Sequence, residues 1–304
     1  MGKGKFTFGN LPGATFFKYD IKDITFIYKA LLASNAVCKI VKNTGEELGT
    51  GFLISPNLIL TNNHVISSST QNNLIVFFEN NYSIENGNMR LTTPIEERTI
   101  SFDVFLTDPK LDFTIVAINK PINFEFIILG RNNPNKECLI IHYPRVDSKS
   151  ITLNSIKIVG DIPKQISDFC KHNFWYESDT ASGSSGSPLF DSDWNLIGLH
   201  HGFLPKYVDK NGKYEFIKID GSKVCVKDYY SNGYVYDEKD FVQIANEGTK
   251  IIDIIVKILD QIKQTKTDYL KELKGIIDGK LPHDYDTLKD TSIAINKIKK
   301  SLII

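Results

Sequence analysis

The chain has 304 residues, of which 41% are hydrophobic and 24% are charged, the composition of an ordinary globular protein with enough apolar material for a core. Its 36 basic and 36 acidic residues give a net charge of zero, so the charge balance favours neither a nucleic acid nor an anionic membrane as a partner. The sequence contains no apolar run of about 18 residues and no secretory signal near its start. We therefore expect neither a membrane-spanning helix nor a membrane partner.

Four cysteines are spread widely along the chain and form no C-x-x-C pair. This spacing predicts buried thiols of a reducing compartment rather than a disulfide framework. It also leads us to expect a cytoplasmic location. The four are Cys38, Cys138, Cys170 and Cys225.

Hydrophobic patterning divides the chain into four parts. Residues 1–34 are expected to form an N-terminal arm followed by a short helix over 21–34. Short apolar runs separated by Gly, Asn, Pro and Asp then predict two sets of strands, over 35–125 and 126–248. Beyond residue 249 the hydrophobic period becomes that of a helix, which predicts a C-terminal helical segment over 249–304.

Smaller elements are also indicated. Residues 214–227 read as a hairpin with Asp220-Gly221 at its turn. In the C-terminal segment, helical patterns cover 249–265, 268–278 and about 285–302. We expect the first of these helices to pack on the second set of strands.

Three segments together indicate nucleophilic catalysis. They are GTGFLISPNLILTNNHVI with His64, LDFTIVAI with Asp112, and DTASGSSGSPLF with Ser185. Taken alone, each is a weak signal, because a histidine after a strand, an aspartate at a turn and a Gly/Ser loop are all common. Together they supply a hydroxyl nucleophile, a base and a carboxylate that orients the base. Glycine at position 183 lets the backbone N–H groups of Gly183 and Ser185 converge as an oxyanion hole.

The segments resemble those of the trypsin-like, chymotrypsin-fold serine peptidases. Gly183-Ser184-Ser185-Gly186-Ser187-Pro188 is similar to the nucleophile motif, Thr61-Asn62-Asn63-His64-Val65 to the histidine motif, and Leu111-Asp112-Phe113 to the aspartate motif. The order His, Asp, Ser is that of the chymotrypsin barrels. The closest likeness is to compact bacterial members, namely intracellular trypsin-like peptidases and glutamyl endopeptidases. The resemblance implies a mainly β fold of two six-stranded antiparallel β-barrels, with a C-terminal α-helical extension and a triad of His64, Asp112 and Ser185.

Two positions depart from the family pattern. Zymogens of animal trypsin-like enzymes carry Asp immediately before the nucleophile, whereas this chain has Ser184. The family often has a serine that supports the triad carboxylate, and His200 or His201 occupies that neighbourhood here. The group that supports Asp112 is left open by the sequence.

The resemblance also marks a candidate substrate pocket formed by Asp179, Thr180, His200, His201 and Gly202. In the pocket, Asp179 would favour Lys or Arg at the cleaved position, whereas Thr180 and His200 match positions that bind Glu. The alternative for Asp179, which we slightly favour, is a buried, hydrogen-bonded brace for its loop. A protonated His200 beside Asp179 would instead leave a polar, neutral pocket.

The expected function is therefore a serine endopeptidase that cleaves peptide bonds through an acyl-enzyme and needs no cofactor or metal. The remaining histidines lack the spacing of metal ligands, and we expect His142, His172 and His283 to be structural or exposed. Residues 266–304 exceed what a peptidase needs, so they are either a docking or regulatory element for a partner protein or a helical cap. The competing hypotheses are a catalytically silent peptide-binding module and an esterase on the same scaffold.

Overall fold

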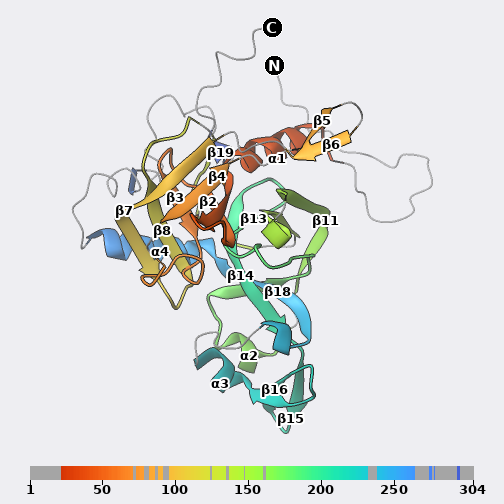
Figure 1. Cartoon of the computed structure of the whole chain (residues 1–304). Helices are drawn as coiled ribbons and strands as arrows, with labels where there is room; N and C mark the ends of the chain where they lie inside the picture. The colour runs from red at the N-terminus through yellow and green to blue at the C-terminus, as the bar shows by residue number, and fades with distance from the viewer. Residues whose placement is uncertain are drawn as a thin grey trace, which may run out of the picture.

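The computed structural model describes residues 22–70, 73–78, 82–85, 88–91, 96–123, 125–134, 137–146, 148–159, 162–231, 238–263, 274–275, 277 and 293–294. Within these residues, two closed β-barrels follow one another along the chain (Figure 1). A short helix, α1 (Thr25–Asn35), precedes the first barrel.

The first barrel has the strand order β1-β2-β3-β8-β7-β4, with every neighbouring pair of strands antiparallel. Its β8 strand, FTIVAI, is buried at every position, as expected of an apolar run covered on both faces. The strands are β1 (Val37–Lys42), β2 (Glu47–Leu53), β3 (Leu58–Thr61), β4 (Leu74–Phe78), β7 (Glu96–Asp108) and β8 (Phe113–Ile118).

The second barrel has the order β10-β11-β12-β18-β14-β13. Its β14 strand is also buried throughout and runs between β13 and β18. The strands are β10 (Glu137–His142), β11 (Ser150–Val159), β12 (Asn173–Tyr176), β13 (Pro188–Phe190), β14 (Leu196–Pro205) and β18 (Gln243–Lys250). The two barrels confirm the fold class expected from the resemblance.

The chain between β14 and β18 forms a separate three-stranded sheet, which lies at the lower end of Figure 1. The expected hairpin is confirmed there, because β16 pairs with β17 and Gly221 has φ +85° at the turn. The sheet and the helices beside it are β15 (Tyr207–Lys210), β16 (Lys213–Ile217), β17 (Lys223–Cys225), α2 (Lys164–Ser167) and α3 (Val226–Ser231). The remaining short elements are β5 (Tyr82–Glu85), β6 (Asn88–Leu91), β9 (Phe126–Ile127), β19 (Ile293–Ala294) and the 3-10 turns Pro144–Val146 and Glu238–Asp240.

The helix that closes the second barrel, α4 (Ile251–Lys263), reaches across to the first barrel. Lys257 Nζ lies 2.9 Å from Asp108 Oδ2, and Gln261 Nε2 donates to Thr107 O at 2.9 Å. The apolar face of α4 belongs to the same buried cluster as the core of the first barrel. The expectation that this helix packs on the second barrel is confirmed by its contacts with β14 and β18, and its apolar stripe also packs against the first barrel.

Two further expectations need correction. Ile293–Ala294 pairs as strand β19 with β9, so the helix expected over 285–302 is wrong at these two residues. Residues 274–275 and 277 are helical, and the other residues of the two expected tail helices lie outside the described ranges. Three of the cysteines are buried thiols as predicted, but Cys225 is exposed. Of the helices in the described ranges, none has the length and apolar character needed to span a membrane.

Candidate active site

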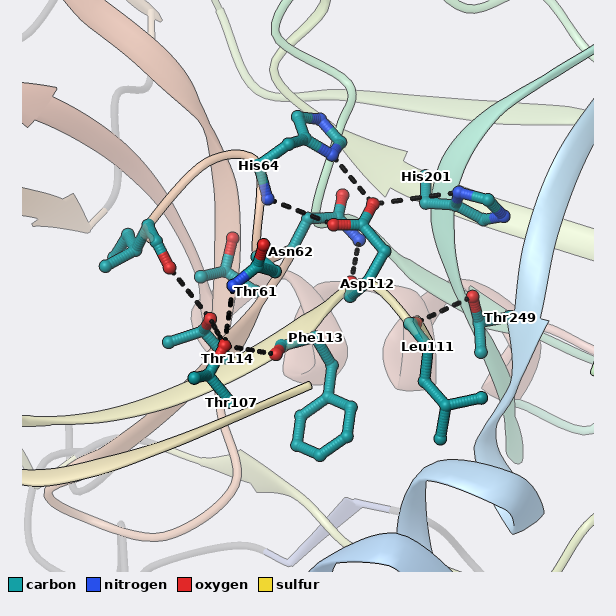
Figure 2. Close-up of polar contacts among 12 residues, drawn as sticks. Thr61, Asn62, His64, Thr107, Leu111, Asp112, Phe113, Thr114, His201 and Thr249 are labelled. Atoms are coloured by element: carbon teal, nitrogen blue, oxygen red, sulfur yellow. Dashed lines mark hydrogen bonds and ion pairs between the residues drawn. The ribbon is translucent and has the colours of Figure 1, made fainter. Parts of the chain in front are cut away.

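His64 lies in the loop that follows β3, and threonines of the neighbouring strands hold this loop. Asn63 Nδ2 donates to Thr107 Oγ1 at 2.7 Å, and Thr114 Oγ1 donates to Ile66 O at 2.8 Å. Figure 2 shows these polar contacts beneath the loop. The residues on both sides of His64 are thereby anchored to β7 and β8.

Asp112 immediately precedes β8 and has a backbone conformation that is rare for a residue with a side chain. Its φ is +49°, and a non-glycine residue persists there only where its surroundings hold it. Asn62 Nδ2 donates to Asp112 O at 2.8 Å, and Thr249 Oγ1 donates to Leu111 O at 3.1 Å. The position of Asp112 is therefore fixed from the His64 loop and from β18 of the other barrel.

The carboxylate of Asp112 makes two hydrogen bonds with His64. Its Oδ2 lies 2.7 Å from His64 Nδ1, and its Oδ1 accepts the His64 backbone N–H at 3.0 Å. The Asp112 side chain is 7% exposed and that of His64 is 48% exposed. In Figure 2 the second ring nitrogen, Nε2, faces away from Asp112. This is the arrangement in which a buried carboxylate orients an imidazole so that Nε2 can exchange a proton.

His201 approaches the same carboxylate from β14. Its Nδ1 lies 3.6 Å from Asp112 Oδ2, and its side chain is 1% exposed. The β14·β18 register shifts between His200 and Gly202, and such a bulge redirects the extra side chain. Burial lowers the pKa of His201 to about 4, with His64 acting in the same direction and Asp112 opposing it. Of the two candidates raised by the sequence, His201 is thus the one beside Asp112, as a neutral imidazole at neutral pH.

Ser185 lies in a tight loop between β12 and β13 that depends on two glycines. Gly183 has φ +94° and Gly186 has φ +86°, both in the region that favours glycine. A Cβ on Gly186 would collide with Thr50 O and Thr61 Oγ1. The sequence needs glycine here because the loop is pressed against the first barrel.

The same loop touches the neighbourhood of His64. Ser185 O accepts the N–H of Thr50 at 2.8 Å. A Cβ on Gly49 would lie 2.9 Å from Ser185 O and 2.9 Å from Val65 Cγ2. Gly49 therefore lets the Ser185 loop and the residue after His64 approach one another across β2.

Two of the candidate pocket residues differ from the sequence-based alternatives. Asp179 is exposed, so the expectation that it is a buried, hydrogen-bonded brace for its loop was wrong. The hydrogen bonds that hold this loop involve Thr180 and Asn246 instead. His200 is buried, and its Nδ1 lies 2.8 Å from Tyr176 OH. Burial holds the pKa of His200 well below its usual value, so the protonated His200 expected to neutralise Asp179 is not the form present at neutral pH.

Thr180 meets a residue that the sequence analysis missed as a site residue. Its Oγ1 donates to Asn246 Oδ1 at 2.5 Å, while Asn246 Nδ2 donates to Ser178 O at 2.6 Å. Asn246 lies on β18 and pairs with Phe203 of β14, whereas Gly202 pairs with Glu247. Nothing local in the sequence links Asn246 to a loop more than 60 residues earlier, so only the β-sheet register reveals the contact.

The expectation that His142 is structural or exposed is confirmed in its first form, because the residue is 3% exposed and its Nδ1 lies 2.8 Å from Ser184 Oγ. The sequence did not indicate this contact with the Ser185 loop. Ser184 directly precedes Ser185. The structure thus brings His64, Asp112 and His201 together, and it places His142 beneath the Ser185 loop.

Comparisons with known proteins agree with this description. Residues 49–199 match the model of a family described as "Trypsin-like peptidase domain". The chain is 34% identical over 265 residues to an uncharacterised protein of Sinorhizobium fredii, covering 80% of this chain and 38% of that protein. It is 25% identical over 164 residues to the serine protease Rv3671c of Mycobacterium tuberculosis, covering 51% of this chain and 36% of the relative. The chain thus spans well under half the length of these relatives.

Among solved structures, the active form of the Rv3671c protease matches with a TM-score of 0.47 and 17% identity, covering 81% of this chain and 93% of that one. The HtrA-type protease AlgW, solved with a decapeptide, matches with a TM-score of 0.48 and 15% identity, covering 77% of this chain and 67% of that one.

Proposed function

We propose that the chain is a serine endopeptidase with Ser185 as nucleophile, His64 as base and Asp112 as the carboxylate that orients the base, since residues 49–199 match the model of the trypsin-like peptidase domain. The observation that carries the proposal is the 2.7 Å hydrogen bond between His64 Nδ1 and Asp112 Oδ2. Gly49 lies close to both Ser185 O and the Val65 side chain, so the loop that carries His64 adjoins Ser185. Ser185 is partly exposed, as a residue that meets a substrate must be.

The proposed reaction has two halves. Ser185 Oγ attacks the peptide carbonyl carbon and forms a C–O bond, while its proton passes to His64 Nε2. The C–N bond then breaks, and the leaving amine takes that proton, which leaves an acyl ester on Ser185. Water attacks the ester by the same route, releasing the acid and restoring the hydroxyl. Asp112 keeps the ring of His64 oriented and stabilises the transient imidazolium.

We propose that the N–H groups of Gly183 and Ser185 stabilise the oxyanion. Support comes from the peptide that joins Ser182 to Gly183, whose carbonyl oxygen accepts the Arg145 N–H at 2.6 Å. In a planar trans peptide the C=O and N–H point in opposite directions, so the Gly183 N–H is turned away from Arg145. The Gly183 carbonyl in turn accepts Thr50 Oγ1 at 2.7 Å, which fixes the next peptide as well. One such donor typically contributes about 3 kcal/mol of transition-state stabilisation.

For the substrate pocket we propose a wall formed by Thr180, Asn246 and Gly202, with Asp179 at its rim. The Thr180–Asn246 bond of 2.5 Å places neutral polar groups there, and His200 adds no positive charge because burial lowers its pKa. These contacts favour a small or uncharged side chain at the cleaved position over Glu. Profiling with a peptide library tests this, and a dominant preference for Lys or Arg would instead make Asp179 the selecting group.

We also propose that residues 266–304 dock a regulatory partner. The proposal rests on the length of this segment beyond what a peptidase needs, and the pairing of Ile293–Ala294 with β9 brings part of it back onto the body of the protein. Truncation after Thr265 tests the idea. Unchanged folding, activity and partner recruitment would reduce the segment to a structural cap.

The test of the proposed function is covalent labelling by a fluorophosphonate probe. The native protein should be labelled at Ser185, and Ser185→Ala should abolish labelling. Ser222→Ala is the matched control, because Ser222 lies in the β16–β17 turn and its loss should leave labelling intact. An unlabelled native protein that still binds peptides would support the silent binding module instead.

A further inference from the structure

The residue before the nucleophile is fixed by a buried histidine. His142, at the end of β10, places Nδ1 2.8 Å from Ser184 Oγ. Both side chains are shielded, with 3% of His142 and none of Ser184 exposed. A polar contact of this length inside a protein is a hydrogen bond of full strength, and losing one partner leaves the other buried and unsatisfied.

Ser184 also organises the turn that carries Ser185. Its Oγ accepts the Ala181 N–H at 3.1 Å, and its own N–H donates to Ala181 O at 2.9 Å. Its carbonyl accepts Ser187 Oγ at 2.6 Å. Ser184 therefore ties together both sides of the loop, and His142 ties Ser184 to the barrel.

The hydroxyl of Ser184 has one proton to donate. Of these contacts of Oγ, the Ala181 N–H can only donate, so the hydroxyl proton has an acceptor when His142 Nδ1 carries no proton. A neutral ring protonated on Nε2 meets this requirement. Burial lowers the pKa of His142 to about 4, so the ring is neutral at neutral pH.

The strand end that carries His142 also fixes the oxyanion side of the loop. Tyr143 N donates to Thr50 Oγ1 at 3.2 Å, and Arg145 N donates to Ser182 O at 2.6 Å. Arg145 has φ +54°, a rare conformation that directs its N–H toward the loop. His142, Tyr143 and Arg145, at the end of β10, therefore hold residues 182–184 in place, either directly or through Thr50.

We propose that His142 and Ser184 are a pair of positioning residues that hold the nucleophile and oxyanion loop in its working shape by a neutral hydrogen bond. This inference rests on the proposed peptidase function. An aspartate at position 184 would need a charged partner. The neutral hydrogen bond between Ser184 and His142 needs none, so it can form as soon as the chain has folded. Neither side chain touches the reacting atoms, so their effect should fall on the rate of the chemical step rather than on probe binding.

The experiment measures fluorophosphonate labelling over a range of probe concentrations, which separates the maximal rate constant from the half-saturating concentration. His142→Leu and Ser184→Ala should each lower the maximal rate constant by about 100-fold, the effect of a small misplacement of catalytic groups, with little change in half-saturation. His142→Asn keeps a polar atom near the position of Nδ1 and should restore most of the rate. The double variant should be no slower than the slower single variant, because both changes remove the same bond.

Ile140→Val is the matched control, since Ile140 lies two residues earlier on β10 in the barrel interior. It should lower the free energy of unfolding while leaving the rate constant unchanged. Ser184→Ala removes one oxygen atom only, so it remains informative if His142→Leu fails to fold. Native-like rates in both Ser184→Ala and His142→Leu would overturn the inference while leaving the proposed function intact. Rates that fall in Ile140→Val as much as in Ser184→Ala would overturn it too. An unlabelled native protein would contradict the proposed function itself.

Discussion

A buried glutamate on β18 should make the stability of this protein depend on pH. Glu247 is fully buried, and burial raises the pKa of its carboxyl to about 8, although a hydrogen bond from Asn173 Nδ2 at 2.5 Å acts in the opposite direction. At neutral pH the folded protein therefore holds Glu247 protonated, whereas the unfolded chain exposes an ionised carboxylate. We predict that Glu247→Gln, which keeps the acceptor for Asn173, stabilises the protein at pH 7 and above.

The size of the effect follows from the two pKa values. A carboxyl whose pKa is raised on folding contributes its full stability below the unfolded value of 4.5 and loses it as the pH rises toward the folded value of about 8. Each pH unit in this interval is worth about 1.4 kcal/mol. The native protein should thus lose about 3 kcal/mol by pH 7 and about 5 kcal/mol above pH 8, and Glu247→Gln should not.

The assay is urea unfolding of the native and substituted proteins at several pH values from 4.5 to 8.5, both in a Ser185→Ala background that prevents self-cleavage. Comparison at equal pH cancels the contributions of other titrating groups. Trp175 stands directly opposite Glu247 in the β12·β18 register, so its fluorescence should also titrate near pH 8 in the native protein alone. A stability difference that is the same at every pH, or a less stable Glu247→Gln variant at pH 8, would refute the reasoning.

Four further outcomes are expected. Asp112→Asn should lower the fluorophosphonate labelling rate by about 10⁴-fold without unfolding the protein, because the imidazole would lose its orienting carboxylate. Gly186→Ala should destabilise the fold by about 3 kcal/mol or more in urea unfolding, since the new methyl group meets backbone at a positive φ, whereas Gly212→Ala, with φ +78° and open space around it, should lose about 1 kcal/mol. Thr249→Val should lower the free energy of unfolding by about 1 kcal/mol and slow labelling, and Thr249→Ser should match the native protein. One thiol per native chain, that of Cys225, should react with iodoacetamide, and mass spectrometry of the peptides would reveal any other modified cysteine.

The sequence was sufficient for the elements whose signals are local. Apolar runs such as FTIVAI predict strands because burial on both faces requires them, and Asp220-Gly221 predicts a hairpin because the turn needs a positive φ. The bounds of β12 (Asn173–Tyr176) could not be predicted from the sequence, since four residues without clear alternation give no periodicity to read. Ile293–Ala294 was expected to be helical, and its pairing with β9 depends on residues more than 160 positions away.

The same limit explains the candidate site. Motif spacing singled out His64, Asp112 and Ser185, because each motif is contiguous in sequence. The contacts of His142 with Ser184 and of Thr180 with Asn246 arise from barrel closure, which no local pattern encodes. The exposure of Asp179 likewise depends on how its loop leaves β12.

The contacts that hold the candidate site are exchanged between the two barrels. Thr50, on the first barrel, binds the carbonyl of Gly183 and, through its N–H, that of Ser185, so the nucleophile loop of the second barrel is shaped by the first. Thr249, on the second barrel, binds Leu111 O beside Asp112, so the carboxylate loop of the first barrel is shaped by the second. Each barrel alone would leave its own loop without these partners, and backbone groups that lose buried partners favour other conformations. The proposed activity should therefore require the docked pair of barrels, which gives a reason for α4 to contact both the second barrel and the strand that leads to Asp112.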